Sequence, residues 1–270
     1  MNRLLCANFK RFFRNKVMWV SAAVMLLIGI LFAVKTTEML SVDKVTFIFA
    51  LPTGLALAAF VSLFIGTDYS DGTIRNKLIT GHKRISIYLS NLIVSVAFGI
   101  LMCIAYLLPI FTIGFARLGF FTLEAKALLM LFGISLMLIL SFASIYTLIS
   151  MLCQNKAVVA VVCVILFIVL LTICAYCNMR LSAPEFYNNY IFMDDSGEIV
   201  QGDLMPNPDY VRGIEREIYQ FIYDFLPTGQ AMMFLDLSMV HTWQLAVYSL
   251  IIFVVTTGCG LVLFERLDLR

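Results

Sequence analysis

Long stretches without charged residues dominate the hydrophobic pattern of this chain. Six runs contain no Asp, Glu, Lys or Arg: Val17–Val34, Val45–Thr67, Ile85–Ala116, Ala127–Asn155, Ala157–Met179 and Thr242–Phe264. A helix needs about 20 apolar residues to cross the roughly 30 Å of hydrocarbon in a bilayer. The pattern therefore predicts an all-α polytopic membrane protein with six transmembrane helices.

The third run, Ile85–Ala116, differs from the others in length. It is too long for one perpendicular crossing and too short for two crossings joined by a turn. We expect one tilted or extended helix that is disturbed near Pro109 and Gly114, because proline removes a backbone hydrogen-bond donor.

The composition agrees with this pattern. Of the 270 residues, 61% are apolar and 13% are charged, whereas soluble domains are about 45–50% apolar and about 25% charged. An ordinary soluble enzyme, a disordered chain and a nucleic-acid binder with a basic face are therefore excluded. The formal net charge of +2 names no partner by itself.

The flanking cations predict the orientation, since Lys and Arg are enriched in cytoplasmic segments. With the N-terminus inside, cytoplasmic segments carry twelve Lys and Arg residues and external segments carry seven. We expect a multi-pass protein of the cell membrane with both termini in the cytoplasm. The first run is too long, and too poor in small residues, for a removable signal peptide.

Residues 1–16 combine apolar and cationic positions at helical spacing. The apolar stripe is Leu5, Phe9, Phe12 and Phe13, and the surrounding cations are Lys10, Arg11 and Arg14. This arrangement predicts an interfacial amphipathic helix whose cations face anionic lipid. The alternative is a solvated start to the first transmembrane helix.

The segment 70–81, between the second and third runs, predicts a short cytoplasmic helix. Ser70 or Asp71 can cap its start and Gly81 its end. Ile74 and Leu78 then lie one turn apart on one face. A compact two-faced helix suits docking to another protein, although a solvated turn explains the residues equally well.

The segment 180–241 is the only long polar stretch, and it carries ten acidic residues against three arginines. A hairpin is expected around Asp194–Gly197, with strands at Tyr190–Met193 and Glu198–Val200. Asn207-Pro208 is expected to open an amphipathic helix that Pro227 ends. This α/β-containing external loop covers a substrate exit or captures cations in one interpretation, and merely stays solvated in the other.

Several kinds of chemistry are excluded. No Gly-Lys dipeptide occurs, so the chain has no phosphate-binding GxxxxGK loop, and its two His residues are too far apart for HExxH. Cys174 and Cys177 have CxxC spacing without further ligands, so we expect no metal site. The runs hold no ionisable residue of the kind that ion-coupled carriers place at the midplane. The Ser and Thr residues of the fourth run, Ala127–Asn155, are interpreted as helix-packing positions.

With these residues in hand, the chain resembles the permease subunits of ABC-2 type ATP-binding-cassette exporters, and most closely the bacterial ones linked to bacitracin and lantibiotic resistance. The resemblance rests on the amphipathic start, the six runs and four short stretches. These are Asp68–Thr73 with Arg75, Gly81–Arg84, Leu226–Gln230 and Phe264–Asp268.

The resemblance implies a partner, because such permeases work as pairs with a separate cytoplasmic ATPase. That subunit would bind ATP and Mg²⁺, and this chain would bind no cofactor and would not be an enzyme. The second permease would be another copy or a paralogue. The resemblance makes the segment at 70–81 a coupling helix, with coupling residues Asp68, Asp71, Gly72, Thr73, Ile74, Arg75, Lys77 and Leu78. It makes Pro227–Leu237 a re-entrant turn that begins with Pro227, Thr228, Gly229 and Gln230.

The expected organisation is an interfacial helix at 1–16, five transmembrane helices within 17–179, the acidic loop at 180–241, and the sixth transmembrane helix with a short tail at 242–270. The expected function is the permease subunit of a bacterial exporter that moves an amphipathic or apolar substrate outward, such as an antimicrobial peptide. The alternative is a non-transporting membrane sensor or scaffold whose acidic loop binds a ligand.

Overall fold

The computed structural model describes residues 1–36, 41–189, 191–193, 199–237 and 242–267. Six helical segments are long and apolar enough to cross a membrane: Lys16–Lys35, Val42–Ser70, Arg84–Leu118, Ala125–Leu152, Lys156–Ser182 and Thr242–Arg266. The six transmembrane helices predicted from the charge-free runs are therefore confirmed by length and composition. Most of these segments extend a few residues beyond the runs, so that Asp43 and Asp68 fall at the two ends of the second segment.

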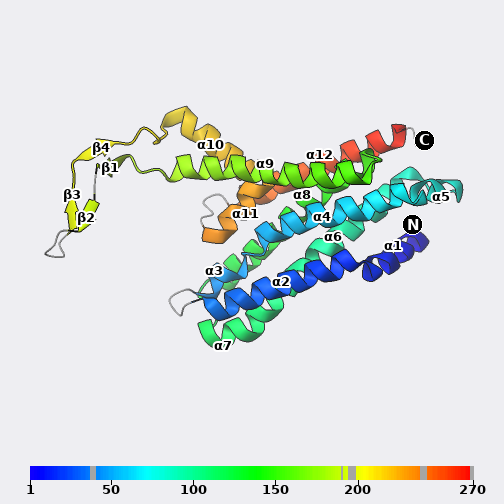
Figure 1. The fold of residues 1–270 in the computed structure, drawn as a ribbon, viewed down its shortest axis with the longest axis horizontal. Coiled ribbons are helices and arrows are strands. Elements are labelled where there is room, and N and C mark those ends of the chain that lie inside the picture. The colour runs from blue at the N-terminus through cyan, green and yellow to red at the C-terminus, as the bar shows by residue number, and fades with distance from the viewer. Residues whose placement is uncertain (37–40, 190, 194–198, 238–241, 268–270) are drawn as a thin grey trace.

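The long helices lie side by side and form one bundle (Figure 1). Helix α4 (Ala50–Ser70) packs against α6 (Arg84–Pro109), α8 (Ala125–Leu152) and α9 (Lys156–Ser182). Helix α2 (Lys16–Lys35) packs on α6, and α12 (Thr242–Arg266) packs on α8. In the most apolar 18-residue stretch of the segment that contains α4, 61% of the residues are buried. In the corresponding stretches of α2, α9 and α12 the share is 22% each. Helix α4 is thus the centre, and the other three leave apolar surface uncovered.

The Ser and Thr residues of α8 link it to its neighbours. The Ser141 hydroxyl donates to the Ser249 carbonyl at 2.8 Å, and the Ser144 hydroxyl accepts from Thr256 at 2.7 Å. Thr147 donates to Ser95 of α6 at 3.1 Å. Ser141, Ser144 and Thr147 join α8 to its neighbours in the way that small polar residues do in membranes, and these contacts support their interpretation as packing positions.

The third transmembrane segment is disturbed where its sequence predicts. Helix α6 ends at Pro109, a π-helical turn η1 (Ile110–Gly114) follows, and α7 (Phe115–Leu118) completes the segment. Proline cannot donate the backbone hydrogen bond that would continue a regular helix, and wide turns of this kind accommodate the irregularity. A short helix α3 (Val42–Thr46) precedes α4 at the same end of the bundle.

The polar segment after α9 contains two antiparallel strand pairs. Strand β1 (Phe186–Asn188) pairs with β4 (Leu204–Pro206), and β2 (Ile191–Met193) pairs with β3 (Ile199–Gln201). The β2–β3 pair confirms the strands of the predicted hairpin, while its turn at Asp194–Gly197 lies outside the described residues. Tyr190 and Glu198, at the predicted strand ends, also lie outside them.

The helix that follows starts later than predicted. Helix α10 spans Gly213–Phe225, so the prediction that Asn207-Pro208 opens it is wrong. The Asn207 side chain accepts a hydrogen bond from the Asp209 backbone at 2.9 Å and closes a local turn instead. Asn side chains compete with helices in this way. Pro227 does separate α10 from the next helix, α11 (Pro227–Asp236).

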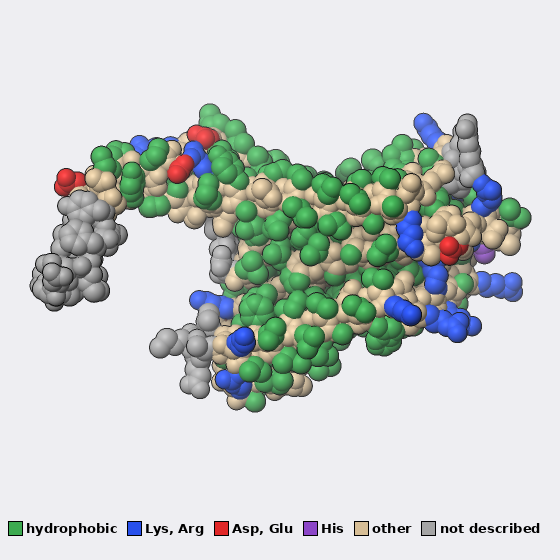
Figure 2. Space-filling model, in the orientation of Figure 1, with side chains coloured by type: hydrophobic (Ala, Val, Ile, Leu, Met, Phe, Trp, Pro, Cys, Tyr) green, Lys and Arg blue, Asp and Glu red, His purple; other side chains and the backbone are tan. Residues whose placement is uncertain are grey.

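The two ends of the chain lie at the same end of the bundle, beside α1 (Asn2–Arg14) and α5 (Thr73–Ile79) (Figure 1). Figure 2 shows most Lys and Arg side chains at this end, while acidic side chains appear over α10 and the strands at the opposite end. Arg84 joins two helices here, because its guanidinium donates to the carbonyls of Phe264 at 2.9 Å and Leu267 at 2.5 Å.

Candidate functional site

The turn between α4 and α5 depends on Gly72. Its φ of +65° lies in the left-handed region that favours glycine, and it precedes the first residue of α5. No side chain caps this helix start, so the prediction that Ser70 or Asp71 caps it is wrong. Ser70 is instead the last residue of α4, where its hydroxyl donates to the Thr67 carbonyl at 3.1 Å.

The end of α5 is closed by Gly81, as predicted. Gly81 has a φ of +86°, its backbone N–H donates to the Leu78 carbonyl, and the His82 N–H donates to the Lys77 carbonyl at 3.1 Å. These two bonds form the Schellman arrangement, which satisfies carbonyls that a helix end leaves free. Helix α5 is therefore a short helix with a fixed start and a fixed end.

Helix α5 turns its apolar face toward its own protein. Ile74 is 1% exposed and packs in the core, and Leu78 packs beside it. The surface that a partner could touch consists of Arg75, Asn76 and Ile79, and Ile79 is 76% exposed. Docking through Ile74, expected from the sequence, is contradicted by this burial, because its side chain is already covered.

Asp68, in the last turn of α4, is the centre of a buried charge cluster. Its side chain is fully buried, one carboxylate oxygen pairs with the Arg11 guanidinium of α1, and the other lies 2.9 Å from the Lys77 ammonium of α5. The Arg11 guanidinium also lies 3.7 Å from the centre of the Phe64 ring. One carboxylate thus links three helices, and its charge is used inside the chain rather than exposed on α5.

Asn8 of α1 extends the cluster to a fourth helix. Its amide nitrogen donates to Ser90 at 3.0 Å and to Asn91 at 3.1 Å in α6, and its oxygen accepts from Lys77 at 3.1 Å. All polar atoms of the Asn8 side chain are therefore used inside the protein. Because buried polar groups without partners are costly, this network fixes α1 in one position on the bundle.

Helix α1 consequently turns a different face inward than the sequence suggests. The face against the bundle contains Leu4, Asn8 and Phe12, each 3% exposed or less. The remaining stripe residues differ in exposure: Leu5 and Phe9 are half-buried, and Phe13 is 54% exposed. The expectation that Arg11 faces anionic lipid is wrong, because its guanidinium is bound to Asp68. The position of α1 at a membrane interface remains a prediction.

The cluster carries more positive than negative charge. Burial lowers the pKa of Arg11 to about 10, with Asp71 acting against this effect. Burial also lowers the pKa of Lys77 to about 7, and the neighbouring Arg11 lowers it further. Asp68 supplies a single negative charge to two buried cations, so loss of the Lys77 proton leaves a neutral Arg11–Asp68 pair.

This lowered pKa predicts a pH effect on stability. Between about pH 7 and 10.5 the unfolded chain holds a proton on Lys77 that the folded chain has begun to release. The contribution of Lys77 to stability therefore rises with pH in this window. From pH 7 to 8 we expect the native chain to gain at most about 1.4 kcal/mol relative to Lys77→Met. Thermal unfolding of both proteins in detergent measures the gain, and parallel pH profiles would contradict it.

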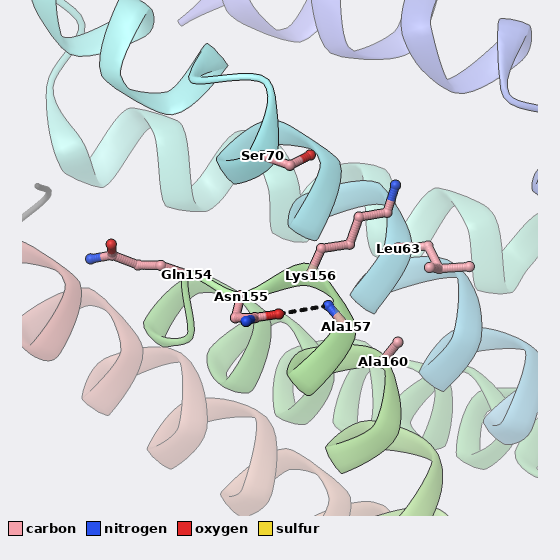
Figure 3. Close-up of a pocket in the computed structure, with 7 residues that line it drawn as sticks. All are labelled: Leu63, Ser70, Gln154, Asn155, Lys156, Ala157 and Ala160. Carbon is pink, nitrogen blue, oxygen red and sulfur yellow. Dashed lines mark hydrogen bonds between the residues drawn. The ribbon is translucent and has the colours of Figure 1, made fainter.

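Two hollows flank the α4–α5 turn. A depression of about 670 Å³ lies between the end of α4 and the α8–α9 link, and a smaller one of about 250 Å³ adjoins it and reaches α5. Figure 3 shows Ser70 across the depression from the link, where the Asn155 side chain accepts from the Ala157 backbone at 3.0 Å. The lining of the first is Leu63, Ser70, Gln154, Asn155, Lys156, Ala157 and Ala160, and Arg75 lines the second. The surface around α5 is therefore concave and offers both apolar and polar groups.

Helices α10 and α11 form a sharp reversal that returns into the bundle. Leu226 separates them in an extended conformation, and α11 packs against α3, α4, α8 and α9. Pro227, Thr228, Gly229 and Gln230 are all buried. The Gln230 amide donates to the Asp224 carbonyl at 2.9 Å and accepts from Ser249 at 2.7 Å, and Thr228 lies 3.2 Å from the Cys174 sulfur.

Gly229 permits the closest approach in this reversal. A Cβ atom placed on Gly229 would lie 2.0 Å from the Tyr223 carbonyl oxygen. We expect Gly229→Ala to push α11 away from α10 and to lower the free energy of unfolding by about 1–2 kcal/mol. Gly133→Ala is the matched control, because no atom lies within 4 Å of the added Cβ there. Equal thermal stability of the two variants in detergent would show that the approach is not tight.

No group of three or more His, Cys, Asp or Glu side chains able to hold a metal ion occurs in the part of the chain that the structure describes. Cys174 and Cys177 are both buried and free. The charge cluster connects α1, α4 and α5, and the hollow beside α5 offers a surface to a partner.

A family model described as ABC-2 type transporter matches residues 2–190, from α1 through α9 to the first strand, with Asp68 and α5 included. The chain belongs to the ABC-2 type transporter family. It is thus the membrane component of a transporter, and membership of an ABC family implies an ABC ATPase as its partner. The comparison with curated proteins finds no match.

In this ABC-2 transporter chain the sequence-predicted site residues separate into three groups. Asp68, Ile74, Lys77 and Leu78 face inward and hold α5 in place, while Asp71 and Arg75 are exposed. The re-entrant residues Pro227–Gln230 form a third, distant group at the other end of the bundle.

Sequence reasoning missed Asn8 and Ile79 in this ABC-2 transporter chain. Asn8 is the one amide among the apolar and cationic residues between Arg3 and Arg14, and a lone polar residue on an apolar helix face is the available signal for a buried partner. Ile79 lies five residues after Ile74, which places it about 140° around the helix from the buried face. Its exposure follows once Ile74 is known to point inward.

Proposed function

We propose that the chain is the permease subunit of an ATP-driven exporter, in which a separate cytoplasmic ATPase acts on α5. The observation that carries the proposal is α5 itself, a helix closed at both ends that presents Arg75, Asn76 and Ile79 beside a concave surface. The cations gathered at this end (Figure 2) support a cytoplasmic position for α5 and for both termini, since Lys and Arg concentrate on that side.

The charge cluster explains how movement of α5 would reach the membrane. A displacement of α5 pulls on Lys77, and Asp68 passes the force to α4 and, through Arg11, to α1. Only Asn15 separates α1 from α2, so the first transmembrane helix moves with α1. In the proposed cycle ATP closes the ATPase subunits. Helices α2 and α9 then tilt at the seam with a second permease copy or paralogue, and the central helix α4 tilts with them.

The cargo we propose is amphipathic or apolar and moves outward. The middle of the described transmembrane segments contains no Asp, Glu, Lys, Arg or His, and such an interior suits a lipid, an apolar drug or an amphipathic peptide better than an ion. The acidic segment 180–241 supports cationic antimicrobial peptides as one class of cargo, in the manner of the bacitracin- and lantibiotic-resistance permeases that the sequence resembles.

Site-specific cross-linking tests the proposal. The full chain carries a photoreactive benzoylphenylalanine at position 79, is expressed in its native membrane, and is irradiated before purification in mild detergent. We expect an adduct with an ABC ATPase. The matched control places the same group at Ile85, which is also exposed and lies on α6.

The outcomes separate transport from the sensor or scaffold alternative. An ATPase adduct from position 79, with little from position 85, supports coupling through α5. If no ABC ATPase is cross-linked from position 79, or if both positions react equally, docking on α5 is wrong. A ligand-dependent adduct with another membrane protein would favour the sensor or scaffold alternative.

A further inference from the structure

Helix α10 exposes an apolar stripe on its outer face. Ile214, Ile218 and Phe221 are 75%, 53% and 54% exposed, and their spacing of four and three residues places them on one side of the helix. Figure 2 shows hydrophobic side chains standing out over α10 at the end of the bundle opposite to the termini. Three large side chains in water are unfavourable, so this stripe requires an apolar environment.

The stripe continues into the lipid-facing surface of α12. The Phe221 and Phe225 rings lie 5.9 Å and 5.7 Å from the Tyr248 ring, measured between centroids. Trp243, at the start of α12, is 63% exposed, and Leu250 further along is 47% exposed. Trp and Tyr concentrate where a membrane meets water. The contact with Tyr248 therefore places the second half of α10 at the depth of the lipid head groups.

A hollow of about 560 Å³ lies between α10 and α12 at this depth. Arg216, Glu217, Asp224, Phe221 and Tyr248 are among the residues that line it. Within the described parts of the chain, neither Arg216 nor Glu217 belongs to an ion pair, whereas the Asp224 carboxylate accepts from Gln220 at 2.7 Å. One cation and two carboxylates thus border an aromatic wall.

We propose that α10 and the first two turns of α12 bind a phospholipid whose head group combines a phosphate with a primary ammonium. The Arg216 guanidinium suits the phosphate, and the Glu217 carboxylate suits the ammonium. The excess of acid over base disfavours a head group with net negative charge, and the acyl chains lie along the apolar face of α12. This site goes beyond the proposed transport function and requires no ATPase.

The two tryptophans of the chain make the proposal measurable, since Trp19→Phe leaves Trp243 as the only one. The full chain with this substitution is reconstituted into vesicles of phosphatidylglycerol and phosphatidylethanolamine. In one series the ethanolamine lipid carries bromine near the head-group end of its acyl chains, and in the other the glycerol lipid does. Bromine quenches tryptophan fluorescence only at close range, so the dependence of quenching on composition reports which lipid occupies the site.

We expect the ethanolamine lipid to be preferred at Trp243 about fivefold, which corresponds to about 1 kcal/mol. Adding Arg216→Gln and Glu217→Gln together should remove the preference. The matched control is Glu124→Gln with Lys126→Gln, which removes one acid and one base that are exposed at the same end of the bundle and should retain it.

Three results would overturn the proposal. Absence of quenching by either lipid would show that α12 begins in water. Quenching that follows the bulk composition, or a preference for phosphatidylglycerol, would show that no ammonium head group is selected. A preference that survives removal of Arg216 and Glu217, or that disappears equally in the control, would show that these two residues do not form the site.

Discussion

Asp68→Asn is expected to lower the free energy of unfolding of the chain by about 3 kcal/mol. Removing one partner of a buried ion pair leaves the other charge uncompensated, which typically costs about 3–5 kcal/mol. Two cations lose their counterion here, but the Arg11 side chain is 31% exposed and water relieves part of the cost. The measurement is thermal or denaturant unfolding of the full chain in detergent.

Asp71→Asn is the matched control for Asp68→Asn. The chemical change is the same and the residue lies three positions further on. Its exposed side chain acts on Arg11 through its charge but forms no ion pair within the described residues, so its effect should stay within about 0.5 kcal/mol. Hydrogen exchange gives a second, local measurement, because α1 should lose protection over residues 2–14 only when Asp68 is replaced. Equal protection of α1 in both variants would mean that the cluster does not hold α1.

Ile79→Ala is expected to weaken binding of the partner ATPase about 30-fold, or by about 2 kcal/mol, if α5 is the docking helix. Ile79 is the most exposed large apolar side chain on α5, and exposed apolar residues inside a binding surface contribute strongly once a partner covers them. Its removal should leave the fold intact, because its side chain is largely outside the core.

Ile85→Ala provides the comparison for Ile79→Ala, since both replace an exposed isoleucine at the same end of the bundle. Affinity is measured with the permease in nanodiscs and the purified ATPase in solution, and ATP turnover of the complex is measured in parallel. Loss of affinity in both variants would point to a general effect on this end of the protein. Unchanged affinity in both would remove Ile79 from the interface.

The transmembrane helices could be predicted because the length and composition of a continuous stretch of sequence are enough to identify them. A charge-free run of sufficient length has few alternatives to a spanning helix, and all six were found. The irregularity after Pro109 was predicted for the same reason, since a missing backbone donor acts locally. The start of α10 could not be predicted, because the side chain of Asn207 can either cap the start of a helix or close a turn. Only the surrounding contacts decide between the two.

Which faces of the short helices α1 and α5 are buried could be determined only from the three-dimensional structure. Arg11 and Ile74 each occupy a position that suits either a surface or an interior, and helical spacing gives the relative angle between residues without the direction of the bundle. Asp68, which forms an ion pair with Arg11, lies 57 residues away in the chain. A buried charge can be recognised only with its partners, and those partners come from helices that the sequence places far apart.

The hydrogen bonds from Arg84 to the carboxyl end of α12 connect this helix to any movement that α5 makes in the proposed cycle. Arg84 lies five residues after the end of α5 and donates hydrogen bonds to the carbonyls of Phe264 and Leu267. A rigid rotation of α5 that carries the start of α6 must therefore drag the final turn of α12 along. If the proposed cycle operates, spin labels at Glu265 and near Ala50, at the start of α4, would register a nucleotide-driven displacement without any modification of α5.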